Sequence, residues 1–241
     1  MKYMGSKNRI AKHLLPIILK DRKEGQWYVE PFVGGANMID KVDGNRVGAD
    51  SNEYLIAALK LIRDNPMTIP SVITEEDYSK LNKSRDTNGI TGFVGFAMSF
   101  GGKWFGGYRR DVKGTKGCYD NMVTQTRRSK ASAVKQSVNI QGVDLICAKF
   151  QELEIPPNSI IYCDPPYSNT TKYKDGDFPH DEFWQWCRGK VKEGHQVFIS
   201  EYNAPDDFAC VWQQELAVTI SKGKQKKALE KLFVHKSQLD A

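Results

Sequence analysis

The residues best suited to chemistry are four consecutive ones, Asp164-Pro165-Pro166-Tyr167. The preceding run, Ser159 to Cys163, is short and mostly apolar, which predicts a buried strand that stops at the proline pair. The prolines lack backbone donors, so a carboxylate, outward-facing carbonyls and an aromatic ring converge. Such a site suits a planar ring with an amino group, whose hydrogens Asp164 and a carbonyl accept while Tyr167 stacks on the ring. Taken alone, the motif fits an ordinary turn equally well.

The predicted elements place further candidate groups beside this motif. Residues 27–33 are predicted to form a strand that runs into the glycine turn Gly34-Gly35, and Arg46 to Asp50 a second strand that ends in an acid. In open α/β sheets, ligands bind at the carboxyl ends of strands. A glycine turn followed about 15–20 residues later by an acid is the arrangement in which a carboxylate binds the ribose of a nucleoside.

The other periodic segments favour an α/β fold. Ser6 is predicted to cap a helix whose apolar stripe includes Ile10 and Leu14, and Ser51 or Asn52 to cap another. Further elements are predicted at 75–81 (helix), 181–192 (helix), 196–200 (strand), 211–220 (strand) and 229–234 (strand), with the lysine-rich 222–227 joining the last two. We therefore expect a Rossmann-like, mostly parallel sheet with a C-terminal antiparallel hairpin.

Composition narrows the class of protein. The chain has 241 residues, 40% hydrophobic and 27% charged, which is ordinary for a globular protein. No apolar stretch approaches the length that spans a bilayer and the start lacks the apolar segment of a signal peptide, so we expect a cytoplasmic protein without a membrane partner. The five cysteines include no CxxC pair, and we expect neither a metal site nor a disulfide framework.

Positive charge is unevenly distributed. Residues 103–135 contain nine Lys or Arg against two Asp, a surplus of seven where the whole chain has +6. Interspersed aromatic residues, among them Trp104, Phe105 and Tyr108, favour a nucleic-acid surface over a solvated loop. The glycines around them predict a flexible loop at 101–110 that becomes ordered on a partner. The candidate contacts to nucleic acid are Lys2, Lys103, Arg109, Arg110, Arg127 and Arg128.

The middle of the chain is predicted to be an insertion. Gly89, Gly92 and Gly95 suggest a broken, turn-rich region, and the polar run 124–137 is either a solvated helix or part of the basic surface. We therefore assign residues 1–65 and 138–241 to a catalytic domain and 66–137 to an inserted target-recognition region.

Four segments in order resemble the Dam-like N6-adenine DNA methyltransferases, and ordered motifs are more specific than any one of them. The segments are Lys2-Tyr3-Met4-Gly5-Ser6-Lys7, Val29-Glu30-Pro31-Phe32-Val33-Gly34-Gly35, Ala49-Asp50-Ser51-Asn52 and Asp164-Pro165-Pro166-Tyr167. The similarity spans roughly residues 1–60 and 145–235. The chain departs from the family at Ala36, where a further glycine is frequent, and around Glu152.

The resemblance implies roles for individual residues. S-adenosylmethionine would be the cofactor, double-stranded DNA the substrate, and a bacterial or phage-infected cell the setting. The residues implied for the cofactor are Tyr3, Lys7, Glu30, Phe32, Gly34, Gly35, Asp50, Phe150 and Asp164. Asp164, Pro165, Pro166 and Tyr167 would receive a flipped adenine. The alternatives are a methyltransferase of an RNA base or protein amide, and a DNA-binding relative without catalysis.

Overall fold

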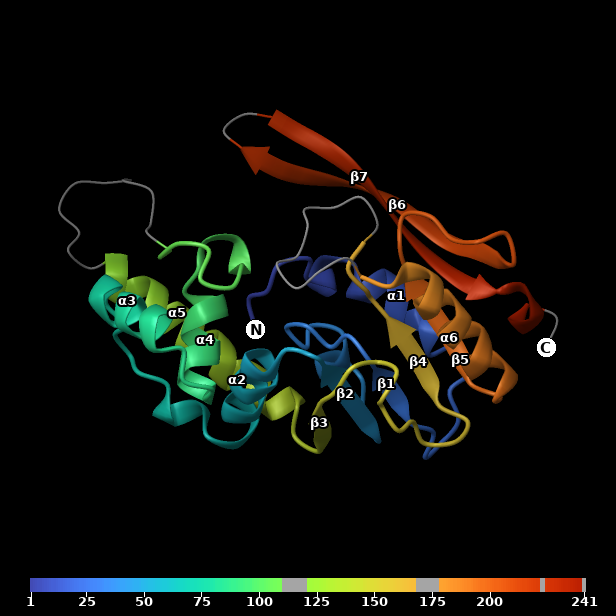
Figure 1. Cartoon of the computed structure of the whole chain (residues 1–241), viewed down its shortest axis with the longest axis horizontal. Helices are drawn as coiled ribbons and strands as arrows, with labels where there is room; N and C mark the ends of the chain where they lie inside the picture. The colour runs from blue at the N-terminus through green and yellow to red at the C-terminus, as the bar shows by residue number, and fades with distance from the viewer. Residues whose placement is uncertain (110–120, 168–177, 222–223, 240–241) are drawn as a thin grey trace.

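The computed structural model describes residues 1–109, 121–167, 178–221 and 224–239, with the backbone alone for 121–124, 216–221 and 224–228. A seven-stranded sheet lies at its centre, in the order β3-β2-β1-β4-β5-β7-β6 (Figure 1). The strands are β1 (Tyr28–Glu30), β2 (Arg46–Asp50), β3 (Val143–Cys147), β4 (Ile160–Cys163), β5 (Gln196–Ser200), β6 (Phe208–Ser221) and β7 (Lys224–His235).

Strands β1 to β5 pair in parallel, and β7 is antiparallel to both β5 and β6. The predicted fold class, a mostly parallel Rossmann-like sheet with a C-terminal antiparallel hairpin, is confirmed. The middle residues of the central strands are mostly apolar because both faces of the sheet are covered. In β4, Ile161 and Cys163 belong to one hydrophobic cluster, while Ile160 and Tyr162 belong to the other.

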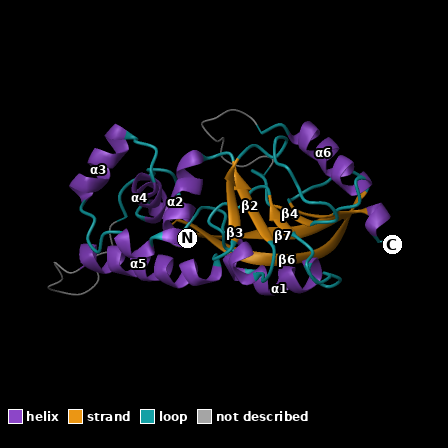
Figure 2. Cartoon of the chain, turned by 90° about the horizontal axis from the view of Figure 1, so that it is seen from below, coloured by secondary structure: helices purple, strands orange, loops and turns teal. Residues whose placement is uncertain are grey.

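Helices cover the sheet on both sides. Figure 2 shows α6 on one side and α1 on the other. On α6, the side chains of Phe183 and Cys187 are fully buried. The helices are α1 (Ala11–Ile18), α2 (Glu53–Asp64), α3 (Glu75–Ser84), α4 (Gly89–Ala97), α5 (Asn121–Asn139) and α6 (His180–Lys192).

Two predicted caps are present. The Ser6 hydroxyl accepts a hydrogen bond from the Asn8 backbone N–H and begins a short 3-10 turn that leads into α1. The Asn52 side chain accepts a hydrogen bond from the Leu55 N–H and caps α2. Each cap satisfies a backbone donor that has no partner within its helix. Of the two residues considered for α2, Asn52 therefore serves as the cap.

The prediction of a broken region around Gly89, Gly92 and Gly95 was wrong, because these residues form the buried helix α4. A β-carbon on Gly92 would lie 2.0 Å from the Tyr54 carbonyl oxygen of α2, and one on Gly89 would lie 2.9 Å from the Ala57 carbonyl oxygen. The glycines are therefore needed for close helix packing rather than for turns. Periodicity did not reveal this, because the cost of glycine in a helix is outweighed by tertiary contact.

The aromatic residues of the basic segment are part of the core. Trp104 packs against Tyr54 and Phe96, with ring centroids 4.5 and 4.8 Å apart, and buried Tyr108 donates a hydrogen bond to the Ile73 carbonyl. The described part of the predicted flexible loop is fixed by backbone bonds such as that from Arg109 N–H to Met98 O. These rings therefore do not support a nucleic-acid surface, as the sequence pattern had suggested.

The C-terminal hairpin is longer than predicted. Its two strands continue beyond the part that pairs with β5 and project from the body of the molecule (Figure 1). Lys224 to Lys227, predicted to lie in the connecting link, belong to β7. Among the described helices, none is long and apolar enough to span a bilayer. The described side chains also include no cluster of potential metal ligands.

Candidate active site

Three adjacent strands place acidic residues at the same edge of the sheet. Glu30 is the last residue of β1, Asp50 is the last residue of β2, and Asp164 directly follows β4. Because these strands are parallel and follow one another in the order β2-β1-β4, their carboxyl ends meet. The predicted position of Asp164, at the end of a buried strand, is confirmed.

Asp164 lies in a network of charges that connects distant parts of the chain. Its Oδ1 is 3.1 Å from the Nζ of Lys7, and the same Nζ is 3.4 Å from Oε2 of Glu230 in β7. Tyr167 donates its hydroxyl to that Glu230 oxygen at 2.9 Å, and Lys7 lies 4.5 Å from the centre of the Tyr167 ring. Tyr202 packs edge-on against Tyr167 at 4.6 Å.

Burial and pairing act in opposite directions on these groups. Burial raises the pKa of Asp164 above its usual value, although Lys7 partly opposes the rise. Burial tends to lower the pKa of Lys7, but the carboxylates of Asp164 and Glu230 together outweigh it, so this pKa is raised. Lys7 therefore stays a cation with two partners, and Asp164 remains basic enough to accept hydrogen bonds.

The glycine turn lies directly against the N-terminal segment. Gly34 has a φ of +49°, and a β-carbon there would lie 3.1 Å from the Tyr3 ring. A β-carbon on Gly35 would lie 2.6 Å from the Met1 carbonyl oxygen. Larger residues would separate the turn from Tyr3. The predicted residues Tyr3, Gly34 and Gly35 thus come together.

Helix α5 also holds this turn. Buried Gln136 donates its side-chain amide to the carbonyls of Gly35 and Ala36, at 3.1 and 3.0 Å. Sequence reasoning missed Gln136, since it lies in a polar helix far along the chain. Ala36 has a φ of +56°, a left-handed conformation that favours glycine. A glycine at this position would adopt the same conformation at a lower energetic cost than alanine.

Asp50 is oriented by backbone donors. Its Oδ2 accepts from the Gly34 N–H at 3.3 Å and its Oδ1 from the Asn52 N–H at 3.0 Å. Burial raises its pKa to about 6, with these two hydrogen bonds opposing the rise. Each carboxylate oxygen can accept a second hydrogen bond. The side chain is thus suited to bind a diol.

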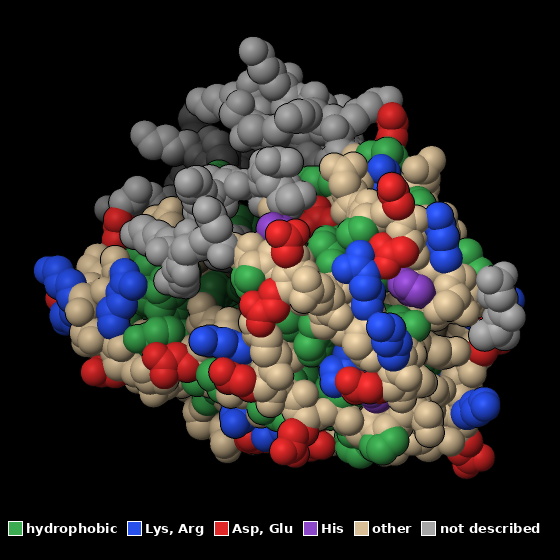
Figure 3. Space-filling view, turned by 45° about the vertical axis from the view of Figure 1, so that its right-hand side comes forward, with side chains coloured by type: hydrophobic (Ala, Val, Ile, Leu, Met, Phe, Trp, Pro, Cys, Tyr) green, Lys and Arg blue, Asp and Glu red, His purple; other side chains and the backbone are tan. Residues whose placement is uncertain are grey.

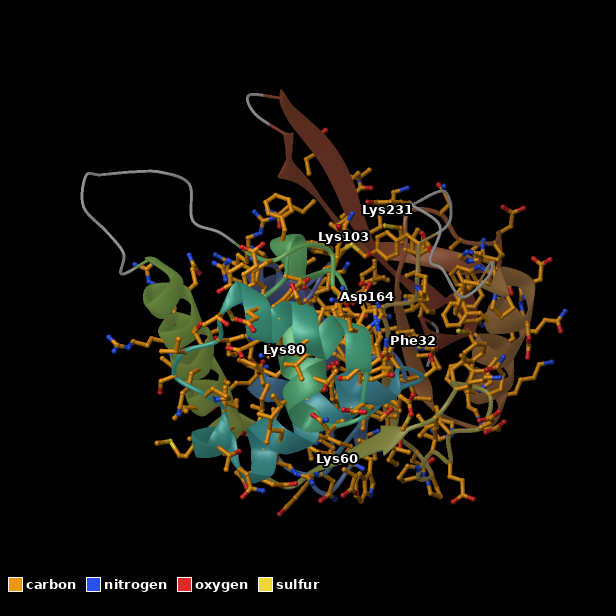
Figure 4. The ribbon with its side chains drawn as sticks, turned by 60° about the vertical axis from the view of Figure 1, so that its left-hand side comes forward. Phe32, Lys60, Lys80, Lys103, Asp164 and Lys231 are labelled. Atoms are coloured by element: carbon orange, nitrogen blue, oxygen red, sulfur yellow. The ribbon has the colours of Figure 1, made fainter. Side chains whose placement is uncertain are left out.

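An aromatic cluster lies beside the glycine turn. The Phe32 ring is 5.5 Å from that of Phe150 and 5.7 Å from that of Phe178. In the view of Figure 4, Phe32 and Asp164 both lie toward the middle of the molecule. Phe150 is buried against this cluster and Phe32 is half-buried. The structure thus brings these two predicted residues together and adds Phe178, which the sequence analysis had not identified.

The Glu30 side chain is more deeply buried than a side chain that binds a cofactor from solvent would be. It is 2% exposed and accepts a hydrogen bond from the Tyr28 hydroxyl at 2.9 Å. Burial raises its pKa well above the usual value, and the hydrogen bond from Tyr28 opposes the rise.

Three of the predicted nucleic-acid contacts share a pocket. Lys2, Arg109 and Arg128 line a hollow of about 120 Å³, together with Ser129 and Ser132 of α5. Burial, and then the charge of Arg109, lower the pKa of Lys2. Within the described residues, no carboxylate forms an ion pair with these three cations.

The remaining predicted contacts lie apart from this basic pocket. Lys103 and Arg127 are exposed and do not line it, and Arg110 lies outside the described residues. A larger hollow of about 430 Å³ lies along α1, and no predicted site residue lines it. The side chains of the candidate active site converge elsewhere, at the carboxyl ends of the parallel strands.

The sheet order and the acids at the carboxyl ends of β1, β2 and β4 define a Rossmann-like α/β protein with a ligand site at that edge of the sheet. Residues 3–91 and 106–229 match the model of the D12 class N6 adenine-specific DNA methyltransferases, and the chain belongs to this family.

Two individual proteins are similar to the chain. The type II methyltransferase M.FokI of Planomicrobium okeanokoites is 22% identical over 201 residues, which cover 73% of this chain and 30% of that protein. The crystal structure of a protein from Listeria monocytogenes, described as a class I S-adenosylmethionine-dependent methyltransferase, matches 96% of this chain and 60% of that one. Its identity is 12% and its TM-score 0.40.

The site fits the cofactor of this family. Asp50 offers acceptors for ribose hydroxyls at the carboxyl end of β2, where nucleosides bind in such sheets. The turn at Gly34 and Gly35 leaves no space for β-carbons, and the Phe32 and Phe150 rings form an apolar surface beside it. The roles of these residues remain predictions.

Proposed function

We propose that the protein transfers a methyl group from S-adenosylmethionine to N6 of an adenine flipped out of double-stranded DNA. The observation that carries the proposal is the position of Asp164 and the two prolines at the end of β4, next to the strand ends that bear Glu30 and Asp50. Family membership supports the choice of adenine in DNA.

The reaction requires the amine to become a nucleophile. The lone pair of an aromatic amine is delocalised into its ring, so the nitrogen reacts poorly. Asp164 and the Pro165 carbonyl accept the two amine hydrogens, which favours a pyramidal nitrogen with a localised pair. The cofactor, when bound, would supply an electrophilic methyl group for in-line attack and would leave as S-adenosylhomocysteine, while the nitrogen loses one of its two hydrogens as a proton, for which Asp164 is an acceptor. The protein's residues thus position and polarise the acceptor.

Tyr167 holds the adenine ring. The Lys7 ammonium lies 4.5 Å from the centre of the Tyr167 ring, and we propose that the adenine stacks against this same side chain. The hydroxyl bond to Glu230 and the edge of Tyr202 fix the orientation of Tyr167. Flipping the base costs a few kcal/mol, and stacking on a ring that is already oriented offsets part of this cost.

The basic pocket binds the DNA backbone. Lys2 and Arg109 carry positive charge close together, as the lowered pKa of Lys2 reflects, and Arg128 adds a third charge. A phosphate neutralises them and accepts hydrogen bonds from the neighbouring serine hydroxyls. Lys2 is joined through Tyr3 to the glycine turn, so DNA held here is close to the cofactor.

Transfer of tritium from labelled S-adenosylmethionine tests the proposal. The purified protein is incubated in parallel with duplex DNA, with RNA of the same sequence and with a protein mixture. We expect label in DNA, recovered as N6-methyladenine after digestion. Label in RNA or protein alone would contradict the proposal, and an inactive protein that still binds DNA would indicate a non-catalytic relative.

A further inference from the structure

Glu230 occupies an unusual place in the C-terminal hairpin. It lies two residues before Leu232, where β7 begins to pair with β5. Because side chains alternate along a strand, Glu230 shares a face with Leu232 and Val234, which are 0% and 3% exposed. An acid thus extends an otherwise apolar row at the edge of the sheet where β4 ends.

One oxygen of Glu230 contacts two residues of the proposed active site. Oε2 accepts the Tyr167 hydroxyl at 2.9 Å and lies 3.4 Å from the Lys7 ammonium. The side chains of Lys7 and Glu230 are 8% and 14% exposed. At this burial an ammonium without a counterion is strongly disfavoured, so the second carboxylate matters for Lys7.

The Lys7 ammonium and the incoming adenine amine compete for the Asp164 carboxylate. Glu230 provides a second carboxylate for Lys7. Oδ1 of Asp164, which is 3.1 Å from Lys7, belongs to the group that must accept a hydrogen of the incoming amine. To do so it must weaken its contact with the ammonium. If Asp164 were the sole partner of Lys7, this exchange would leave a buried cation unpaired.

We propose that Glu230 is a positioning residue for methyl transfer, holding Lys7 and the Tyr167 hydroxyl so that Asp164 is free to accept the adenine amine. The inference rests on the proposed function and adds to it a residue from the opposite end of the chain. Glu230 does not itself touch the reacting atoms; it acts through Lys7 and Tyr167.

Glu230→Gln removes the negative charge of the side chain and keeps its size and shape. The amide oxygen of glutamine can still accept the Tyr167 hydroxyl, but it no longer neutralises Lys7, which then pairs with Asp164 alone. We expect kcat to fall about 10- to 100-fold, with KM for DNA and for S-adenosylmethionine changed less than about threefold. Glu215→Gln is the matched control, since it removes an acid from the partner strand of the same hairpin and should leave kcat unchanged.

The pH profile supplies a readout that a purely structural role would not move. The negative charge of Glu230 raises the pKa of Asp164. Its removal should lower that pKa and shift the acidic limb of the kcat profile to lower pH. The other titratable groups that interact with Asp164 keep their side chains in the variant: they are Lys7, Tyr167, Tyr162 and Glu30.

A double-mutant cycle tests the route through Lys7. In a Lys7→Met background there is no ammonium left to hold, so the further change Glu230→Gln should alter kcat by less than about twofold. An equal loss in both backgrounds would overturn the role through Lys7. Thermal unfolding of each variant shows whether it is folded. If Glu230→Gln fails to fold, Glu230→Asp tests the proposal instead, because it keeps the charge and should restore activity.

The outcomes for the two proposals are separable. If the wild type labels DNA and Glu230→Gln has its full kcat and an unshifted acidic limb, the inference about Glu230 fails while the proposed function stands. If the wild type labels no DNA, both fail.

Discussion

Two groups of charges in this protein are treated in opposite ways. At the carboxyl ends of the strands, Lys7 is buried between two carboxylates. In the basic pocket, Lys2, Arg109 and Arg128 lie together, and no carboxylate of the described residues pairs with them. The face seen in Figure 3 provides a third case, because basic side chains there are interspersed with acidic ones.

The difference in charge pairing gives the Lys7 network and the basic pocket different physical properties. A charge satisfied within the protein fixes the positions of its neighbours and responds little to salt, since buried pairs are weakly screened. Cations held close together without a counterion repel one another until an external anion binds. We therefore assign positioning to the Lys7 network and ligand binding to the basic pocket.

The largest effect should come from Asp164→Ala, which removes the acceptor of the amine hydrogens. We expect kcat to fall by at least about a thousandfold, with DNA affinity changed less than about threefold, as measured with tritiated cofactor and by fluorescence anisotropy. Asp144→Ala on the exposed side of β3 is the control. Transfer within about tenfold of wild type would show that Asp164 does not have this role.

DNA binding by the basic pocket should depend on salt concentration, whereas the buried contacts of the Lys7 network should not. Lys2→Ala with Arg128→Ala should weaken DNA binding about 10- to 100-fold and reduce the slope of log K against log salt by about 1.8, as expected for two lost phosphate contacts. Lys60→Ala with Lys80→Ala removes two exposed lysines that lie away from Asp164 in Figure 4. An unchanged slope in the pocket variant would remove this pocket from the DNA interface.

Substitution of Asp50 tests whether this buried carboxylate binds S-adenosylmethionine. Because its pKa is raised to about 6, its ionised fraction falls as pH drops from 7.5 to 5, and affinity for S-adenosylmethionine should fall with it. Asp50→Asn should bind about tenfold more weakly at pH 7.5 and lose this pH dependence. Calorimetric titration at both pH values measures the two effects, and an equal pH dependence in both proteins would exclude Asp50 as its source.

The smallest effect concerns the packing of α4, which lines the basic pocket, against α2. Gly92→Ala places a β-carbon against the backbone of α2 and should lower the free energy of unfolding by about 1–3 kcal/mol. Gly189→Ala in α6, where nothing lies within 4 Å of the added carbon, should raise it by about 0.5–1 kcal/mol. Urea unfolding compares the two, and equal stabilities would mean that α2 and α4 are less closely packed.

The sequence predicted best what depends on neighbouring residues. The strand that ends at Cys163, a cap for α2 at Ser51 or Asn52, and the acid at the end of β2 all follow from local patterns of apolar residues, proline and capping side chains. The same reasoning failed at α4, where glycine has a tertiary purpose. It also failed for Trp104 and Tyr108, because periodicity does not show which rings a distant helix covers.

By itself, the sequence determined the kind of sheet, the family and the acids at the ends of β2 and β4, because each is encoded in short continuous segments. Tertiary structure alone decided that Glu230 meets Lys7 and Tyr167, that Gln136 holds the glycine turn, and that three of the basic residues share a pocket. The physical reason is that these contacts depend on the order of strands and on helix packing, which bring together residues with no local relation in the chain.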